Sequence, residues 1–339
     1  MPIAWNRVNT LLLVLVLLVL AGALARGVLG GPLDPPAPPA STMKTLEQVE
    51  PRIPISQPAS AAGFPIVISQ PGSYYLTGNI TGVAGQDGIR VNAHDVTIDL
   101  NGLALNGVAG SGNGIVSSGW NTTVINGAVN GWGFDGVNAT AENFHASRVQ
   151  ARNNGQYGFR VASGGLIEDS VATYNAVNGF YIASGGLIED SVATYNGGSA
   201  IVLSGSGVVR GSYFSGNGGI GIDVSGSALV EDNDIVASPG LGIRLAGNGA
   251  TVRNNTLARN GLGGIEVYGQ TNRIEGNTLT GDPAAPLPIP YGIRVTGTHN
   301  FIVRNSASYN ADNFDIGPSN TAGPEETGAA TSPWSNVNY

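Results

Sequence analysis

Short groups of alternating small, apolar and polar residues recur along the chain between residues 88 and 295. A typical group reads small, apolar, polar, apolar, as in Gly179-Phe180-Tyr181-Ile182, and most groups begin 21 or 22 residues after the previous one. The groups begin at Gly88, Gly114, Gly136, Gly158, Gly179, Ala200, Gly221, Gly242, Gly264 and Gly292. Because every second position is apolar, each group predicts a β-strand with one buried face.

One stretch of sequence occurs twice, since residues 162–175 and 183–196 both read ASGGLIEDSVATYN. Such a copy indicates one structural unit repeated at a fixed period. Repeats that present like side chains at like positions stack as parallel strands about 4.8 Å apart. Each added coil buries at least one pair of Ile or Val side chains, worth roughly 3–6 kcal/mol. The pattern therefore predicts an all-β fold, a right-handed parallel β-helix of about ten coils over residues 88–316.

Polar residues also recur at the same period. One set of asparagines lies four residues before the next group, and a second set of Ser and Asn lies between two predicted strands. Asn tolerates left-handed turns, and stacked amides can bond from coil to coil. We interpret both sets as structural ladders: Asn154, Asn175, Asn196, Asn217 and Asn260, and Ser170, Ser191, Ser212, Asn233, Asn255 and Asn277.

Composition agrees with a turn-dense solenoid and excludes some function classes. The chain has 339 residues, 52 of them Gly, and only 11% are charged. It has no Cys, which rules out disulfides and thiolate sites. The net charge of −8 argues against nucleic acid as a partner, because no basic patch is available to contact phosphates.

The N-terminal 25 residues predict export from the cytoplasm. Arg7 precedes an apolar or small run from Leu11 to Ala25, and Ala23-Leu24-Ala25 fits a cleavage site. Residues 1–25 are therefore predicted to be a signal peptide; an uncleaved anchor, the only membrane contact we expect, is the alternative. We predict a periplasmic, cell-surface or extracellular protein with a Pro/Ala-rich linker (26–62), an N-terminal cap with opening strands (63–87) and a C-terminal tail (317–339).

Three stretches resemble the right-handed parallel β-helix repeat family, which has a pectate-lyase-like fold. They read SQPGSYYLTGN (69–79), VTIDLNGLALNG (96–107) and SPWSN (332–336). The last is similar to the tail of an exported, largely uncharacterised bacterial branch. The resemblance covers about residues 64–339. It implies the fold, while the activity stays open, because members include lyases, hydrolases, epimerases and proteins without known chemistry.

The catalytic signatures of that family are missing. The Gly-His-Gly motif of polygalacturonase-like hydrolases has no match, and their Arg-Ile-Lys is replaced by Arg273-Ile274-Glu275. The Asp-Pro-His motif of alginate epimerases is also absent. No tight carboxylate cluster predicts the calcium that a β-eliminating lyase needs. We therefore expect no cofactor or metal, with Ca²⁺ only if the protein is a lyase; His94, His145 and His299 lie on different coils.

Two columns of outward residues carry charges of alternating sign. Alternating charges on neighbouring coils predict ion pairs, since like charges would repel. The alternative is a polar groove for a sugar chain, because fold relatives bind along an outward sheet face. The first column is Arg160, Tyr181, Val202, Asp223, Arg244, Glu266 and Arg294, and the second is His145, Glu168, Glu189, Arg210, Glu231, Arg253, Glu275 and Arg304.

If the protein has a site, the first column supplies its candidate catalytic residues. Asp223 or Glu266 could act as an acid or metal ligand, and Arg244 could bind a carboxylate. The candidate substrate-binding residues are Tyr181 as a stacking platform, Arg160, Arg294, Trp120 and Trp132; Trp132 could instead pack in a turn.

Two functions stay open at this stage. The first is a non-enzymatic module that binds a polysaccharide or cell-surface glycan, or serves as a scaffold. The second is a polysaccharide lyase or glycoside hydrolase that acts on acidic glycans. The oligomeric state is not predicted.

Overall fold

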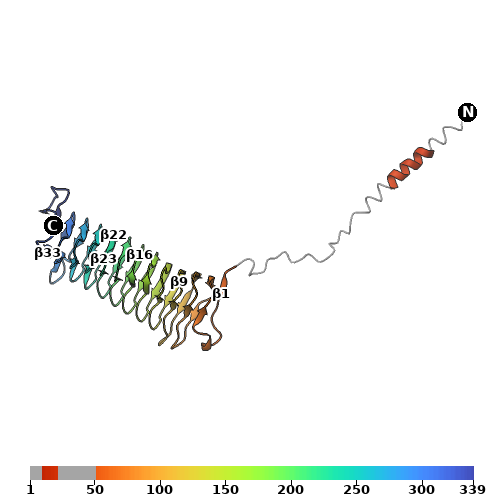
Figure 1. The fold of residues 1–339 in the computed structure, drawn as a ribbon, viewed down its shortest axis with the longest axis horizontal. Coiled ribbons are helices and arrows are strands. Elements are labelled where there is room, and N and C mark those ends of the chain that lie inside the picture. The colour runs from red at the N-terminus through yellow and green to blue at the C-terminus, as the bar shows by residue number, and fades with distance from the viewer. Residues whose placement is uncertain (1–9, 22–50) are drawn as a thin grey trace. The chain divides into compact units, whose positions relative to one another are not determined.

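The computed structural model describes residues 10–21 and 51–339 (Figure 1). The chain divides into two units, Met1–Pro51 and Arg52–Tyr339. In the first unit, residues 10–21 form a helix with exposed Leu and Val side chains. Among the described residues, no helix has the length and apolarity needed to cross a membrane. The predicted cleavage site after Ala25 and residues 26–50 of the predicted linker lie outside the described residues.

The second unit is a parallel β-solenoid, and each coil adds a strand to up to three stacks. One stack is a separate 12-stranded sheet, which we call the first sheet. Its strands are β2 (Ile66–Ile68), β5 (Ile89–Val91), β8 (Ile115–Ser117), β10 (Val137–Ala139), β12 (Phe159–Ser163), β15 (Phe180–Ser184), β18 (Ile201–Leu203), β21 (Ile222–Val224), β24 (Leu241–Leu245), β27 (Gly263–Val267), β30 (Ile289–Val295) and β33 (Asn310–Ile316).

The other two stacks follow the first sheet along each coil. Strands β9 (Thr122–Asn130) and β11 (His145–Arg152) run through both of them. Otherwise the second stack consists of β1 (Ile53–Ile55), β3 (Gly72–Leu76), β6 (Val96–Asp99), β13 (Leu166–Glu168), β16 (Gly186–Glu189), β19 (Gly207–Arg210), β22 (Ala228–Glu231), β25 (Thr251–Arg253), β28 (Arg273–Glu275), β31 (Phe301–Val303) and β34 (Thr321–Ala322).

The third stack forms the remaining side of the coils. It consists of β4 (Ile80–Thr81), β7 (Ala104–Asn106), β14 (Val171–Thr173), β17 (Val192–Thr194), β20 (Tyr213–Ser215), β23 (Asp234–Val236), β26 (Thr256–Ala258), β29 (Thr278–Thr280), β32 (Ser306–Ser308), β36 (Asn336–Asn338) and β35 (Glu325–Thr327). One short 3₁₀ turn, η1 (Ala61–Gly63), precedes the first sheet.

The predicted register of the buried positions is confirmed. Phe159, Phe180, Ile201 and Ile222 pair in succession across neighbouring strands and are fully buried. The rings of Phe159 and Phe180 stack with centroids 5.2 Å apart. The same side-chain type therefore fills the same part of the core from coil to coil. The first sheet has two more strands than the ten predicted groups, because β2 and β33 continue it at its ends.

The solenoid begins earlier than the sequence analysis placed it. Strand β1 lies in the segment predicted as linker, yet it pairs in parallel with β3. Ile55 is buried there although Ile53 is 46% exposed, so β1 joins the stack through its backbone pairing and one buried side chain. At the other end, β36 of the predicted tail pairs with β32, so the tail continues the third stack.

The polar ladders are also confirmed. Asn154, Asn175 and Asn196 each donate from Nδ2 to Oδ1 of the next asparagine at 2.9 Å. The second ladder runs through Asn255 and Asn277 with the same geometry. A third ladder, which was not predicted, runs through Asn272, Asn300 and Asn320. Nδ2 of Asn272 donates to Oδ1 of Asn300, and Nδ2 of Asn300 donates to Oδ1 of Asn320, both at 3.0 Å. These buried amides satisfy one another, which fits a structural role.

Candidate functional site

The outward face of the first sheet carries the first charged column in the predicted order. Parallel pairing places Arg160 beside Tyr181, and Asp223, Arg244, Glu266 and Arg294 on successive strands β21, β24, β27 and β30. The backbone continues this column through Asn138 and Val116 to Arg90 towards the N-terminus, and to Asp315 towards the C-terminus. The predicted candidate residues therefore lie on one surface, one per coil.

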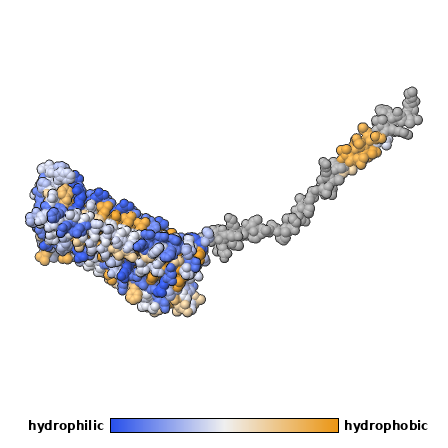
Figure 2. Space-filling model, in the orientation of Figure 1, coloured by the Kyte–Doolittle hydropathy of each residue, from blue (hydrophilic) through white to orange (hydrophobic). Residues whose placement is uncertain are grey.

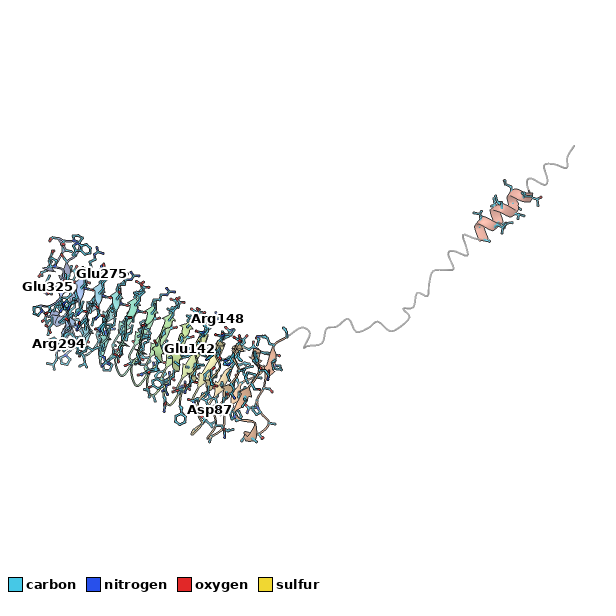
Figure 3. The ribbon with its side chains drawn as sticks, in the orientation of Figure 1. Asp87, Glu142, Arg148, Glu275, Arg294 and Glu325 are labelled. Atoms are coloured by element: carbon cyan, nitrogen blue, oxygen red, sulfur yellow. The ribbon has the colours of Figure 1, made fainter. Side chains whose placement is uncertain are left out.

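In the C-terminal half of this column the arginines are held by carboxylates of the same chain. Arg244 donates from Nε and Nη2 to the two carboxylate oxygens of Asp223, at 2.8 and 2.7 Å. Arg294, near the C-terminal end (Figure 3), lies 3.7 Å from Glu266 and 3.2 Å from Asp315. The predicted ion-pair ladder is confirmed here. A catalytic role of Asp223, Arg244 or Glu266 stays a prediction.

Glu266 is the most enclosed carboxylate of this half, with only 5% of the residue exposed. Two tyrosines lie beside it: Tyr268, two residues later on the same coil, and Tyr291 on the next coil. The pKa of Tyr268 is raised, chiefly because its hydroxyl bonds to Glu266. Burial and the charge of Glu266 raise the pKa of Tyr291 to about 12. Tyr291 ends a Pro-rich insertion, residues 281–291 (GDPAAPLPIPY), and covers Gly263, where a Cβ would lie 2.4 Å from the ring. Glu266 is therefore a buried carboxylate enclosed by two tyrosines, with Arg294 3.7 Å away.

Arg160, in the N-terminal half of the column, differs from the other arginines. In the described part of the chain no carboxylate forms an ion pair with it; its Cζ lies 5.7 Å from the ring centroid of Tyr157. Tyr157 in turn contacts Tyr181, with ring centroids 5.6 Å apart. Arg160 and Tyr181 line a groove of about 300 Å³ with Asn138 and Thr140. The groove thus combines an arginine that forms no ion pair, one tyrosine ring and neutral hydrogen-bonding groups.

Asp135 adds a buried carboxylate that interacts with the charge of Arg160 and that the sequence analysis missed. It is 1% exposed, and one of its oxygens accepts a hydrogen bond from the backbone N–H of Tyr157 at 3.1 Å. Burial raises its pKa, although the Tyr157 bond and the charge of Arg160 oppose the shift. The signal in the sequence is an Asp directly before a group, at a turn position that other coils fill with Asp87, Asn113 or Asn178.

The two predicted tryptophans differ in exposure. Trp120 is exposed and its ring lies on His94, with centroids 4.9 Å apart, so it stays a candidate contact. Trp132 is 1% exposed, and its Nε1 donates to the carbonyl of Leu105 at 3.1 Å. Its ring fills the space beside Gly88, where a Cβ would lie 2.7 Å from it. The prediction that Trp132 binds substrate is wrong, because its ring is core packing of a turn.

The ends of the second charged column were also misplaced. The backbone pairs Ser147, not His145, with Glu168, and the partner of Glu275 is the residue before Arg304. Both side chains still reach the column: His145 Nε2 is 3.1 Å from Glu168 Oε1, and Arg304 Nη1 is 3.0 Å from Glu275 Oε1. Coils of unequal length explain the error, because counting residues fixes the register only where the period is constant.

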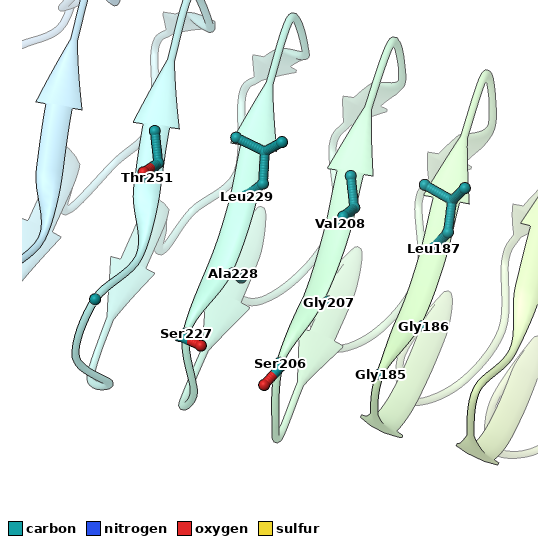
Figure 4. A pocket seen from close by; sticks show the side chains of 11 residues that line it. Gly185, Gly186, Leu187, Ser206, Gly207, Val208, Ser227, Ala228, Leu229 and Thr251 are labelled. Carbon is teal, nitrogen blue, oxygen red and sulfur yellow. The ribbon is translucent and has the colours of Figure 1, made fainter.

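A second groove of about 610 Å³ lies on the second stack. Figure 4 shows Leu187, Val208 and Leu229 side by side on neighbouring strands, above Gly and Ser residues. Hydrophobic patches are also visible on the solenoid in Figure 2. No charged side chain lines this groove. The groove beside Arg160 is therefore the better candidate for an acidic ligand.

No resident metal is indicated by the geometry. Within residues 10–21 and 51–339, no group of three or more His, Asp or Glu side chains could hold a metal ion.

Comparison with known proteins identifies the fold. Residues 219–324 match a family model described as a right handed beta helix region. This chain is a right-handed β-helix protein. The matched part of the β-helix contains Asp223, Arg244 and Glu266. No curated protein matches the sequence of this β-helix protein.

Solved structures similar to this β-helix protein include two modules that share most of its length. The A-module of mannuronan C-5 epimerase AlgE6 from Azotobacter vinelandii is 18% identical, covers 84% of this chain and 86% of its own, and has a TM-score of 0.65. The AlgE4 A-module from the same organism is 17% identical, covers 79% of this chain and 88% of its own, and has a TM-score of 0.67. The Dettilon tailspike protein is 14% identical over 84% of this chain and 60% of its own, with a TM-score of 0.51. Identities this low show a shared fold and leave the activity open.

Proposed function

We propose that this β-helix protein is an exported module that binds acidic polysaccharide in the groove beside Arg160. The observation that carries the proposal is the guanidinium of Arg160, which lies in an outward groove without an ion-pair partner. A guanidinium binds a carboxylate in a bidentate manner, which gives both affinity and orientation. The other candidate arginines, Arg244 and Arg294, already contact carboxylates of the chain.

The rest of the groove suits a sugar ring. Tyr181 is half-buried, and its hydroxyl accepts a hydrogen bond from Ser204 at 3.2 Å, which fixes the ring. A fixed aromatic ring can pack on the C–H face of a pyranose, with its polar end left for hydrogen bonding. Asn138 and Thr140 supply an amide and a hydroxyl at the edge of the groove. A uronate residue would meet a cation, a stacking ring and hydrogen-bonding groups together.

Two further observations support export and a glycan ligand. The apolar segment that ends at Ala25 has the form of a signal peptide. The structural relatives from Azotobacter vinelandii are mannuronan epimerases, and mannuronate carries the carboxylate that Arg160 would bind. We propose a periplasmic, cell-surface or extracellular location on this basis.

Calorimetric titration with oligomannuronate and oligogalacturonate tests the proposal. We expect binding that weakens with salt and a loss of at least about tenfold in affinity for Arg160→Ala. Arg90→Ala is the matched control, because Arg90 belongs to the same outward column but is paired with Asp87 at 2.6 Å. Equal loss in both variants, or no binding by the wild type, contradicts the proposal.

A carbohydrate-active enzyme is the second candidate function, and the enclosed Glu266 is the observation that favours it. A carboxylate held beside two tyrosines and an arginine is the kind of group that serves as a general acid or base. Incubation with the same acidic glycans, with and without calcium, tests this by unsaturated-product absorbance and reducing ends. Product that disappears in Glu266→Gln would establish an enzyme. Product formed equally by both proteins would place catalysis elsewhere.

A further inference from the structure

The third stack has a face unlike the other two. On three consecutive coils, the outward residues of β14, β17 and β20, with the residue that follows each strand, are all uncharged. We call this surface the tyrosine face; it consists of Val171, Thr173, Tyr174, Val192, Thr194, Tyr195, Tyr213, Ser215 and Gly216. The backbone register places these residues in three adjacent rows.

Charged residues border the tyrosine face but do not enter it. Arg152 is the neighbour of Thr173 on the preceding coil, and Asp234 is the neighbour of Tyr213 on the following coil. The other two stacks carry charges on these same coils, such as Arg160 on the first sheet and Glu189 on the second stack. A ligand that bears charge would find no opposite charge on the tyrosine face.

The tyrosines are exposed and pre-arranged. Tyr174 and Tyr195 are 58% and 56% exposed, and their rings stack with centroids 5.3 Å apart and planes at 12°. The ring of Tyr195 extends over Gly216, where a Cβ would lie 2.8 Å from it. Tyr213 is 43% exposed. In the described part of the chain, none of the three phenol hydroxyls has a hydrogen-bond partner.

The fold does not require aromatic residues at the turn position that follows β14 and β17. Tyr174 and Tyr195 both have φ of 55°, a left-handed conformation that is unfavourable for bulky side chains. The same corner is occupied by Asn153 and Ala237 on other coils, also with positive φ. The positive φ therefore belongs to the turn of the solenoid, whereas the tyrosine side chains on these two coils are not required by it.

We infer that the tyrosine face binds an uncharged polysaccharide. The pyranose C–H faces and edges would pack on the tyrosine rings, and the sugar hydroxyls would bond to the free phenols. The hydroxyls of Thr173 and Thr194, 3.0 Å apart, add a short polar row beside the rings. An uncharged polymer is the partner whose charge matches this face, since neither side would bury an unpaired charge. This inference concerns a second surface and does not depend on the groove beside Arg160.

Retention on cellulose and chitin, two insoluble uncharged polysaccharides, tests this inference. We expect retention that persists in about 1 M salt, because the contacts carry no charge. The double variant Tyr174→Ala/Tyr195→Ala should lose at least about tenfold in affinity. Tyr309→Ala is the matched control, since Tyr309 is 61% exposed with φ of 58° but lies at the C-terminal end.

Each outcome of this experiment decides the question. The inference is supported if only the double variant loses retention on the polysaccharides while its melting temperature is unchanged. An intermediate loss of retention in Tyr213→Ala supports it as well. No retention of the wild type, or equal retention by the double variant, overturns it. A dimer in sedimentation that the double variant converts to monomer also overturns it, because a second copy of the chain would then cover the face. Arg160→Ala should leave retention on cellulose unchanged.

Discussion

Arg244 lies across the carboxylate of Asp223 on the preceding coil, with Nε and Nη2 at 2.8 and 2.7 Å from its two oxygens. Both residues point outward from adjacent strands of the first sheet. This geometry is the strongest form of an ion pair between protein side chains. It also occupies the donors through which Arg244 would have bound a glycan carboxylate, so the pair acts first as a contact between coils.

A double-mutant cycle of Asp223→Asn and Arg244→Gln measures this contact. We expect a coupling energy of about 1 kcal/mol, because the geometry is bidentate although the Arg244 side chain is partly exposed. The coupling should shrink as salt is added, since solvent-exposed charges are screened. Chemical denaturation at low and high salt provides the measurement. A coupling that salt leaves unchanged would mean that packing, and not charge, joins these coils.

A charge placed in the core should destabilise the protein far more than the loss of the ion pair between Arg244 and Asp223. Ile201 is fully buried between Phe180 and Ile222 of neighbouring strands. Ile201→Asp places an unpaired charge in this column, and we expect the folded state to be lost. Val202→Lys is the charged control, because the next side chain points outward, its charge stays in water, and its neighbour Asp223 has the opposite sign. Circular dichroism and thermal melting compare the two. A cooperative melt of Ile201→Asp near that of the wild type would refute the observed register.

The fold was predictable because its information is repeated at every coil. Phe180 and Ile201 occupy the same position of the repeat, so one correct alignment of the period fixes the whole buried column. The groove carries no such redundancy. Asp135 and Asp87 occupy the same turn position, yet only Asp135 is fully buried, because burial depends on which residues fold over the turn. The sequence left open whether Trp132 stacks on a substrate or packs in a turn, and the packing of its ring beside Gly88 decides for the turn.

The same limit explains the surroundings of Glu266. Its outward position follows from the period, but Tyr291 reaches it only because an insertion lengthens the preceding turn, and no period describes an insertion. The absence of an ion pair at Arg160 could not be predicted either, because a sequence does not show which carboxylates lie close to a given arginine. Periodicity thus predicts the columns, while pairing within and between columns requires the coordinates.

Removing a single amide from the buried asparagine ladder should lower the stability of the protein substantially. Asn196 accepts from the N–H and Nδ2 of Asn175 at 3.0 and 2.9 Å and donates to the carbonyl of Ala172 and to Asn217. Asn196→Ala leaves buried donors of Asn175 and an acceptor of Ala172 unpaired. We expect the free energy of unfolding to fall by about 2–4 kcal/mol. Asn248→Ala is the control, because Asn248 is exposed. Urea denaturation should separate the two variants; equal losses would contradict a ladder that stabilises by satisfying buried groups.

The buried carboxylate of Asp135 predicts a change in the pH dependence of stability. Burial raises the pKa of Asp135 in the folded state above its value in the unfolded chain. The folded protein therefore binds the proton more tightly, so this group lowers the free energy of unfolding as pH rises through the unfolded and then the folded pKa. Asp135→Asn keeps an oxygen that can accept from the N–H of Tyr157 and removes the buried charge. We expect the variant to melt higher than the wild type at pH 7.

The difference between the two proteins should shrink as the pH falls toward the ordinary range of an aspartic acid, because Asp135 is then protonated and neutral in both states. Melting curves between neutral and acidic pH measure this directly. Asp87→Asn should behave oppositely. Although burial opposes the shift, hydrogen bonds from Arg90 and Asn113 lower the pKa of Asp87, so its contribution to stability is present at neutral pH. If Asp135→Asn destabilises the protein at pH 7, the attraction between Asp135 and Arg160 outweighs the cost of burial, and Arg160 is less free to bind a ligand than its lack of an ion pair implies.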